Sequence, residues 1–439
     1  MSDKQGPNDG DENKDINDIL RKKIAELGMT DEFNACSFCG RGFDDDVPMV
    51  RSILNESVKM CFSCVDEAMD VIEETPLPIP SSRDIKTYLD QYVVGQEAPK
   101  KTFSVAVHKH YKRIKYNEEN PDDPVEKSNI LLLGPSGSGK TLLAKTVSRE
   151  MGVPYASADA TQLTEAGYKG LDVESVLEDL IESARGDLTQ AQKGIVYIDE
   201  IDKIQAKSEA SGRDVSGKGV QQALLKLVEG KTFNLGAESA QPIPFDTSNI
   251  LVIVSGAFTG LTGIVKERLA KERKGSGSEI GFGSEPGAAK KISDDEALQA
   301  VTPADLEKFG MLKEFLGRFP VITATHEMDE KMLLRVLTEP KNALVKQFQK
   351  LSETDGGPAL HFEKEALQAI AMAAIKMKTG SRGLRGIMEK VTEDITFNNE
   401  DQGDNVTITA DMVEAALSKK PNLPARSKTS SPNPPNMTP

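Results

Sequence analysis

Three short runs of apolar residues follow one another along the middle of the chain. They are "NILLLG" at 129–134, "GIVYIDE" at 194–200 and "NILVIVSG" at 249–256, and segments with helical periodicity separate them. Runs that are apolar throughout are typical of parallel strands buried on both faces, with helices as the crossovers between them. The pattern therefore predicts an α/β domain built on a parallel sheet.

The pattern becomes helical from about residue 325 onwards. In "EALQAIAMAAIKMK" the spacing predicts one apolar helix face made of Leu367, Ile370, Ala371, Ala374 and Ile375. We therefore expect a large α/β domain at 76–320, followed by a smaller, mainly helical domain at 321–418.

The two ends of the chain lack the residues that could form a core. Residues 1–32 are acidic and poor in aromatic residues, and residues 419–439 are rich in Pro, Ser and Asn. Such segments cannot bury enough apolar surface to offset the entropy lost on ordering, so we expect both to be disordered. A proline-rich linker, "ETPLPIPSSRD", separates a small module at 33–75 from the α/β domain.

The charge balance narrows the range of partners and compartments. The chain of 439 residues has a formal net charge of -15, which disfavours non-specific binding to nucleic acid and to anionic membranes. Its first twenty residues match neither a signal peptide nor a transit peptide, and no apolar run reaches membrane-spanning length. We expect a cytoplasmic bacterial protein with no membrane partner.

All four cysteines of the chain lie in the small N-terminal module. Cys36 and Cys39 form one C-x2-C pair, Cys61 and Cys64 form a second, and 21 residues separate the two pairs. This spacing is close to that of a structural zinc site, in which four thiolates close a tetrahedral shell around Zn²⁺. The alternative is buried or disulfide-bonded cysteines, which a cytoplasmic setting and the matched pairs disfavour.

The stretch "GPSGSGKT" at 134–141 matches the phosphate-binding loop G-x-x-x-x-G-K-[ST] between a predicted strand and a predicted helix. Its backbone amides and the positive end of the helix would hold phosphates, Lys140 would meet the β and γ phosphates, and Thr141 would ligate Mg²⁺. The predicted nucleotide-binding residues here are Gly134, Pro135, Ser136, Gly137, Ser138, Gly139, Lys140, Thr141 and Leu142.

Two acidic residues follow the apolar run "IVYI" of the second predicted strand. Asp199 at that strand end can hold the Mg²⁺ shell, and Glu200 beside it can orient and deprotonate the attacking water. The alternative is a solvated acidic strand end without a catalytic role. With the phosphate loop, the pair predicts an ATP hydrolase that uses ATP and Mg²⁺.

Further stretches resemble one known family. "YVVGQEAPKK", "DVSGKGVQQALLKLVEG", "EFLGRFP", "LTEPKNAL" and "KTGSRGLRGIMEK" are similar to the signature stretches of the ClpX family, AAA+ unfoldases that feed the ClpP peptidase. The resemblance extends from Cys36 to about residue 418. It implies an AAA+ P-loop domain, a small helical domain and a zinc domain, a homohexameric ring, and the cofactors ATP, Mg²⁺ and Zn²⁺.

The resemblance also implies roles for residues outside the phosphate loop. Val93 and Val94 would pack on the adenine. Arg318 of "GRFP" matches the arginine finger that reaches the neighbouring subunit's nucleotide, and Arg382 of "GSRGLR" matches the sensor-2 arginine. An arginine supplied by a neighbour can raise the rate of phosphoryl transfer by about 10³ to 10⁵.

Two loops are expected to line the channel of such a ring. "EAGYKGLDVES" resembles the loop that grips polypeptide, with Tyr168 kept and Lys169 where valine is expected. The lysine stem can still pack along a chain while its ammonium stays in water, which predicts a preference for acidic segments. "GRDVSGKG" resembles the second loop, with Arg213 and Asp214.

A third loop, "GSEIGFGSEPG", resembles the loop that docks on ClpP, with Ile280, Gly281 and Phe282 at its tip. Exposed apolar anchors in polar surroundings typically mark a partner site, although a loop folded back on the body is the alternative. At the channel entrance the family usually has a basic loop, whereas residues 232–248 contain no basic residue. Substrate choice is therefore expected to depend on the zinc module or on adaptor proteins.

The function predicted from the sequence is ATP-driven unfolding of protein substrates and their translocation to a peptidase. The chain carries no peptidase nucleophile set of its own. A second hypothesis is an AAA+ nucleic-acid motor or loader, which the acidic charge and the aromatic channel loop disfavour. A third is a non-hydrolysing scaffold, which the presence of Lys140, Asp199 and Glu200 disfavours.

Overall fold

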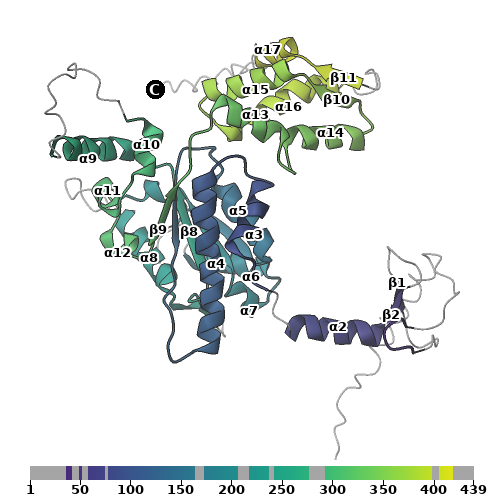
Figure 1. The fold of residues 1–439 in the computed structure, drawn as a ribbon, viewed down its shortest axis with the longest axis vertical. Helices are drawn as coiled ribbons and strands as arrows, with labels where there is room; N and C mark the ends of the chain where they lie inside the picture. The colour runs from purple at the N-terminus through teal and green to yellow at the C-terminus, as the bar shows by residue number, and fades with distance from the viewer. Residues whose placement is uncertain are drawn as a thin grey trace, which may run out of the picture. The chain divides into compact units, whose positions relative to one another are not determined.

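The structure of the chain is a computed structural model (Figure 1). It describes residues 36–41, 49–51, 58–74, 78–163, 173–205, 217–236, 242–275, 292–397 and 405–418. The chain divides into two compact units, Met1–Pro78 and Ile79–Pro439. The expected disordered ends, 1–32 and 419–439, lie outside the described residues.

The smaller unit contains a short antiparallel strand pair and one helix. Strand β1 (Met49–Arg51) pairs with β2 (Lys59–Cys61), and helix α2 (Phe62–Glu74) follows directly. Cys61 is the last residue of β2 and Cys64 lies in the first turn of α2. This turn from strand to helix brings the second cysteine pair towards the first.

Five parallel strands form the central sheet of the larger unit, in the order β4-β5-β8-β3-β9. The strands are β3 (Ile130–Leu133), β4 (Tyr155–Asp159), β5 (Ile195–Asp199), β8 (Leu251–Gly256) and β9 (Val321–Ala324). The three predicted apolar runs form β3, β5 and β8 in the middle of the sheet, so the predicted parallel α/β fold is confirmed.

The central strands are apolar at every position because each of their faces belongs to a different core. On one face, Ile130, Ile195 and Ile253 pack with the helices α3 (Ser82–Asp90), α4 (Glu97–Glu119) and α5 (Lys140–Met151). On the other face, Val196 and Val254 pack with α6 (Val173–Ser183), α8 (Gly217–Glu229) and α9 (Leu261–Gly275). Figure 1 shows the long helix α4 running beside the sheet.

Shorter elements complete this α/β part. They are α7 (Leu188–Ala191), the 3-10 turn η1 (Ile201–Lys203), the antiparallel pair β6 (Thr232–Leu235) and β7 (Ile243–Asp246), α10 (Asp294–Gln299), α11 (Pro303–Phe309) and α12 (Lys313–Leu316). The stretch 232–248, which contains no basic residue, forms the β6–β7 pair, although its tip at 237–241 lies outside the described residues.

A mainly helical part with its own core follows β9. It contains α13 (Glu330–Thr338), α14 (Leu344–Thr354), β10 (Ala359–Phe362), α15 (Lys364–Lys376), α16 (Ser381–Phe397), β11 (Asn405–Ile408) and α17 (Ala410–Ser418). Of the face predicted for α15, Ile370, Ala371 and Ala374 are fully buried, and Leu367 packs at the rim of the core. Ile375, near the end of the helix, is 38% exposed.

Within the described residues, no helix combines the length and the apolar character needed to cross a bilayer. The division of the chain at residues 32, 75, 320 and 418 stays a prediction.

Candidate functional site: a phosphate-binding loop at the sheet edge

The predicted phosphate-binding loop connects the end of β3 to the start of α5. Gly134, Gly137 and Gly139 have φ values of 142°, 76° and 96°, a region that residues with a side chain rarely adopt. Helix α5 begins at Lys140, so its free amides and positive dipole end face the loop. The local geometry is that of a loop that binds phosphate through its backbone.

Two glycines of the loop have no room for a side chain. A Cβ on Gly134 would lie 1.9 Å from Thr325 Oγ1, and one on Gly137 would lie 2.6 Å from the carbonyl oxygen of Thr379. Thr325 directly follows β9, and Thr379 precedes α16 of the helical part. The loop is therefore enclosed by two segments far apart in the sequence, and this close packing fits a nucleotide cradle.

Lys140 lies within this cradle and is only 6% exposed. Its Nζ donates hydrogen bonds to the carbonyl oxygens of Gly134 and Pro135, at 2.8 and 3.1 Å. Burial lowers the pKa of this amine, whereas the nearby carboxylate of Asp199 opposes that shift. The amine is thus held against the loop, where phosphate oxygens could replace the carbonyl oxygens as its acceptors.

The two acidic residues of the second predicted strand lie at the same edge of the sheet. Asp199 ends β5, with its Oδ2 3.4 Å from Thr141 Oγ1. Its Oδ1 accepts from the backbone amide of Glu200 at 2.9 Å. Glu200 has φ 57° and ψ 30°, a left-handed conformation that costs about 1 to 3 kcal/mol for residues other than glycine. The chain therefore turns sharply where a catalytic carboxylate is expected.

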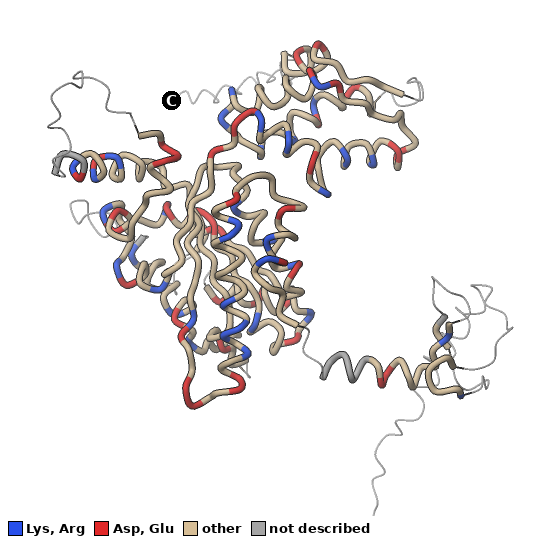
Figure 2. The backbone as a smooth tube through the Cα atoms, viewed as in Figure 1, with Lys and Arg blue, Asp and Glu red and all other residues tan. Residues whose placement is uncertain are grey.

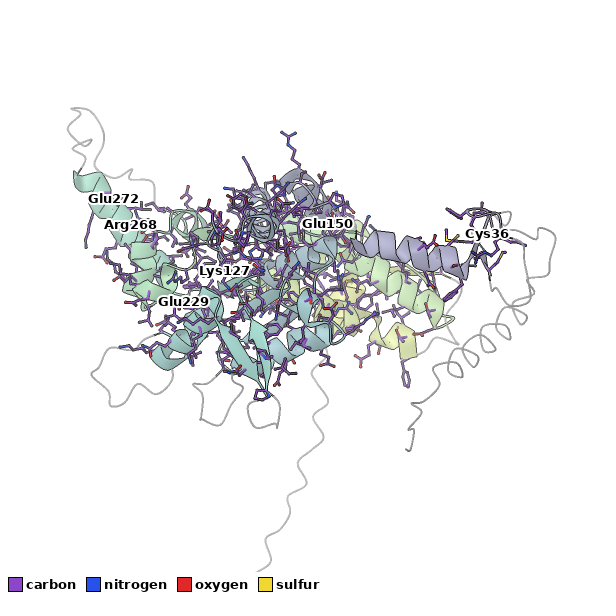
Figure 3. All side chains as sticks on the ribbon, turned by 90° about the horizontal axis from the view of Figure 1, so that it is seen from below. Cys36, Lys127, Glu150, Glu229, Arg268 and Glu272 are labelled. Carbon is purple, nitrogen blue, oxygen red and sulfur yellow. The ribbon has the colours of Figure 1, made fainter. Side chains whose placement is uncertain are left out.

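The two predicted arginines lie in different places. Arg382, in the first turn of α16, has its Nη2 3.7 Å from Asp199 Oδ2, and the preceding Ser381 Oγ donates to the carbonyl oxygen of Gly137 at 2.6 Å. The structure thus brings Arg382 to the phosphate loop. Arg318 instead forms an ion pair with Glu229 at the end of α8, at 3.2 Å, and is 47% exposed. Figure 3 labels Glu229.

The segment predicted to contact adenine runs between α3 and α4. Val93 and Val94 are 2% and 6% exposed, and both line a pocket with the α13 residue Arg335. Lys100 holds this segment, because its Nζ donates to the carbonyl oxygen of Val93 at 3.2 Å and forms an ion pair with Asp90. The two valines and the helical part therefore line the same pocket.

The four cysteines of the smaller unit come together as one cluster. Their sulfur atoms all lie within 4.8 Å of one another, the Sγ atoms of Cys39 and Cys61 are 3.6 Å apart, and none of the four forms a disulfide. Tetrahedral zinc with Zn–S bonds of about 2.3 Å requires sulfur atoms about 3.8 Å apart, so the spacing fits. Cys36 is labelled in Figure 3.

The electrostatics of the cluster also suit a metal ion. Backbone amides, first that of Cys39 and then that of Cys61, lower the pKa of the Cys36 thiol to about 6. Hydrogen bonding among the sulfur atoms, first with Cys39 and then with Cys61, raises the pKa of the Cys64 thiol to about 12. Zinc binds thiolates, so the cysteines would release their protons when the ion binds.

Seven predicted residues lie outside the described residues. They are the channel residues Tyr168, Lys169, Arg213 and Asp214, and the docking residues Ile280, Gly281 and Phe282. Their roles stay predictions.

The sequence reasoning did not find two polar residues that contact the site from within the sheet. Tyr197 Oη lies 3.1 Å from Thr141 Oγ1, and Ser255 Oγ donates to Asp199 Oδ1 at 2.6 Å. A signal was present, because both residues bring a hydroxyl into an otherwise apolar run near the carboxyl end of a central strand. Thr325, whose Oγ1 is 2.6 Å from Ser138 Oγ, was also missed.

A glycine-rich phosphate loop and a strand-end carboxylate pair, on one edge of a five-stranded parallel sheet, define an ATPase of the AAA class. Residues 125–322 match the family described as AAA domain (Cdc48 subfamily). The chain is 46% identical over 381 residues to the "ATP-dependent Clp protease ATP-binding subunit ClpX" of Treponema denticola, an alignment that covers 82% of this chain and 89% of that relative. The chain belongs to the ClpX family of AAA+ ATPases.

Proposed function

We propose that the chain uses ATP hydrolysis to unfold protein substrates and to pass them to the ClpP peptidase. The observation that supports this most is the convergence of Lys140, Thr141, Asp199 and Arg382 on one phosphate loop, in a chain of the ClpX family. The relative from Treponema denticola is named as the ATP-binding subunit of a protease, which agrees with a division of labour between an ATPase and a separate peptidase.

In the proposed mechanism, the loop amides and Lys140 bind the β and γ phosphates of ATP. Thr141 and Asp199 would hold Mg²⁺, which supplies charge neutralisation on the phosphates when bound. Glu200 orients the attacking water and accepts its proton. Arg382 senses the bound nucleotide from the helical part, and its 3.7 Å contact with Asp199 shows that it can reach the site.

Arg318 would act on the nucleotide of a neighbouring subunit in a homohexamer. Its side chain is 47% exposed and pairs with Glu229 on α8, which agrees with a role outside its own subunit's site. Tyr168, Lys169, Arg213 and Asp214 would grip the substrate in the channel of such a ring. Ile280, Gly281 and Phe282 would dock on ClpP, and the four-cysteine zinc module would receive substrates or adaptor proteins.

A nucleic-acid motor is the alternative function. Figure 2 shows acidic and basic residues interspersed over the helices of the larger unit, with acidic residues gathered where α4 ends and in the loop that follows it. Because nucleic-acid binding depends on basic surfaces that neutralise phosphates, this distribution and the net charge of -15 favour a protein substrate. ATP hydrolysis stimulated by DNA would favour the alternative.

The test of the proposed function is ATP-dependent loss of native fluorescence from a stable fluorescent protein that carries an unstructured terminal tag. We expect loss with the intact chain and none with a Glu200→Gln variant, which should bind ATP but hardly hydrolyse it. Several tags should be compared, because residues 232–248 contain no basic residue. Hydrolysis without unfolding of any substrate, with or without added adaptors, would contradict the proposal.

Two further variants test the parts of the mechanism that lie outside the described residues. Lys169→Val should reduce any preference for acidic over basic substrate segments, and unchanged handling of both would contradict the assigned role. A double variant, Ile280→Ala with Phe282→Ala, should keep unfolding but lose degradation by ClpP, because it removes only the docking anchors. Equal loss of both activities would contradict docking.

A further inference from the structure

Four polar side chains form a ring of contacts beneath the phosphate loop. Tyr197 Oη is 3.1 Å from Thr141 Oγ1 and 2.6 Å from Ser255 Oγ. Ser255 Oγ donates to Asp199 Oδ1 at 2.6 Å, and Asp199 Oδ2 lies 3.4 Å from Thr141 Oγ1. The ring therefore links two residues of the nucleotide site, Thr141 and Asp199, through two residues that the proposed mechanism does not use.

Tyr197 and Ser255 are inaccessible to solvent and to nucleotide. They are 1% and 0% exposed, and they lie on the neighbouring central strands β5 and β8. A tyrosine hydroxyl keeps its proton at neutral pH, because its ordinary pKa is about 10. Tyr197 is therefore a neutral hydroxyl that can donate one hydrogen bond and accept others.

The chemistry of the members fixes the direction of each hydrogen bond. An ionised carboxylate has no proton, so Ser255 must donate to Asp199. Because the single proton of Ser255 is then used, Tyr197 must donate to Ser255. Since the proton of Tyr197 is used as well, Thr141 donates to Tyr197 at 3.1 Å, and its longer 3.4 Å contact with Asp199 Oδ2 is left without a proton. The order of donation is thus from Thr141 to Tyr197, then to Ser255, and finally to Asp199.

The order of donation determines which oxygen atoms of Thr141 and Asp199 face a bound cation. The proton of Thr141 points inward, so the lone pairs of its oxygen remain free on the outer side. Asp199 Oδ1 is occupied by Ser255 and by the amide of Glu200, so Asp199 Oδ2 is the oxygen turned towards Thr141 and Arg382. The Thr141 hydroxyl oxygen and Asp199 Oδ2, which lie 3.4 Å apart, are therefore the two oxygen atoms that a cation would meet here.

We propose that Tyr197 and Ser255 are positioning residues that hold Thr141 and Asp199 in the orientation needed to bind Mg²⁺. Groups that orient metal ligands through hydrogen bonds typically change metal affinity by about 10- to 100-fold when they are removed. This inference rests on the proposed roles of Thr141 and Asp199. It adds two residues that orient their side chains before nucleotide binds.

The experiment compares Tyr197→Phe and Ser255→Ala with the unaltered chain. We measure the Mg²⁺ concentration that gives half-maximal binding of a fluorescent ADP analogue, and separately the binding of the same analogue in EDTA. The Mg²⁺ requirement should rise about 10-fold in both variants, whereas binding without metal and the thermal unfolding midpoint should stay unchanged. The double variant should differ little from either single variant, because each change already opens the ring.

The matched control is Tyr155→Phe. Tyr155 lies on the adjacent strand β4, its ring stacks against that of Tyr197 with centroids 6.5 Å apart, and its hydroxyl is not a member of the ring. This variant should keep the normal Mg²⁺ requirement.

Two further variants separate this inference from the proposed function. If Thr141→Ala and Asp199→Asn raise the Mg²⁺ requirement but Tyr197→Phe and Ser255→Ala do not, the positioning role is wrong and the proposed ligands stand. If none of the four changes it, the proposed ligands are wrong as well. Equal losses of nucleotide binding with and without Mg²⁺ in Tyr197→Phe and Ser255→Ala would also overturn the inference, because they would indicate general damage to the site.

Discussion

The smaller and the larger unit of this chain are stabilised in different ways. In the smaller unit, the described residues gather four cysteine sulfur atoms around one point, while the aromatic side chain of Phe38 is 65% exposed. In the larger unit, strands β3, β5 and β8 supply side chains to a separate core on each face of the sheet. A metal ion can replace a hydrophobic core in a module too small to build one, whereas the larger unit has an apolar core on each face of its sheet.

Removal of zinc should produce the largest difference in stability between the two units. Chelation should unfold residues 36–74, because metal binding in such modules is worth about 10 to 16 kcal/mol of apparent folding energy. The unfolding midpoint of residues 79–418 should not change. Hydrogen exchange measured peptide by peptide checks both statements, and a lower midpoint for the larger unit would contradict the separation.

A substitution that creates a cavity in the core of the larger unit should destabilise that unit and leave the zinc module unchanged. Phe103 on α4 is fully buried, so Phe103→Ala should destabilise the ATPase unit by about 3 to 5 kcal/mol. The zinc content of the protein should stay the same. The matched control is Phe397→Ala at the end of α16, where the side chain is 88% exposed and the expected change is below about 0.5 kcal/mol. Similar losses in both variants, measured by urea unfolding, would contradict the assigned core.

Acid should destabilise the larger unit through a buried histidine. His110 Nε2 contacts the carbonyl oxygen of Asn249 at 3.0 Å, and its Nδ1 is buried with no hydrogen-bond partner among the described residues. Burial, and then the nearby positive charges of Arg113 and Lys127, lower its pKa from 6.5 to about 3. The unfolded chain therefore binds a proton at this histidine below pH 6.5, and the folded chain does not. His110 thus lowers the free energy of unfolding by about 1.4 kcal/mol for each unit that the pH falls from 6.5 towards 3.

A His110→Gln variant should lose this part of the pH dependence. Its free energy of unfolding should fall by about 2 kcal/mol less than that of the unaltered chain between pH 6.5 and pH 5. The smaller unit can lose zinc in the same range because its cysteines become protonated, but added zinc should restore only that unit. An unchanged slope in the variant would show that the acid sensitivity arises elsewhere.

The smallest effect on stability should come from an exposed ion pair. Arg318 and Glu229 are 47% and 25% exposed, so Glu229→Gln should change the free energy of unfolding by less than about 1 kcal/mol. Arg318→Ala should be equally mild for stability but should reduce ATP hydrolysis by about 10³-fold or more if it acts on a neighbour's nucleotide. Hydrolysis by Arg318→Ala at the rate of the unaltered chain would remove Arg318 from the mechanism.

The sequence predicted the parts of the fold in which local pattern and burial agree. β3, β5 and β8 are central strands, and their continuous apolar runs identified them. β4 and β9 were not predicted, because they are edge strands that carry polar residues at uncovered positions, such as the exposed Ser157 and the half-buried Thr323. Ile375 belongs to the predicted apolar face of α15 but is 38% exposed, because the spacing defines a helix face but not where that face loses its neighbours.

The candidate site could also be predicted only in part from the sequence. The spacing of "GPSGSGKT" and of the four cysteines identified both clusters, because local geometry alone brings those atoms together. Tyr197, Ser255 and Thr325 were missed because they reach the site from strands whose order in the sheet the sequence does not give. Their contacts depend on the strand order, in which β8 and β9 lie beside β3 and β5 lies beside β8.

The measurement that tests the account most directly combines both units in the intact chain. Zinc is removed with a chelator that leaves Mg²⁺ in place, and ATP hydrolysis and loss of fluorescence from a tagged substrate are then followed. We predict that hydrolysis and unfolding persist for substrates with an unstructured tag that need no adaptor, since both depend on Lys140, Asp199 and Glu200 in the larger unit. Loss of hydrolysis as zinc leaves, while the larger unit stays folded, would contradict it.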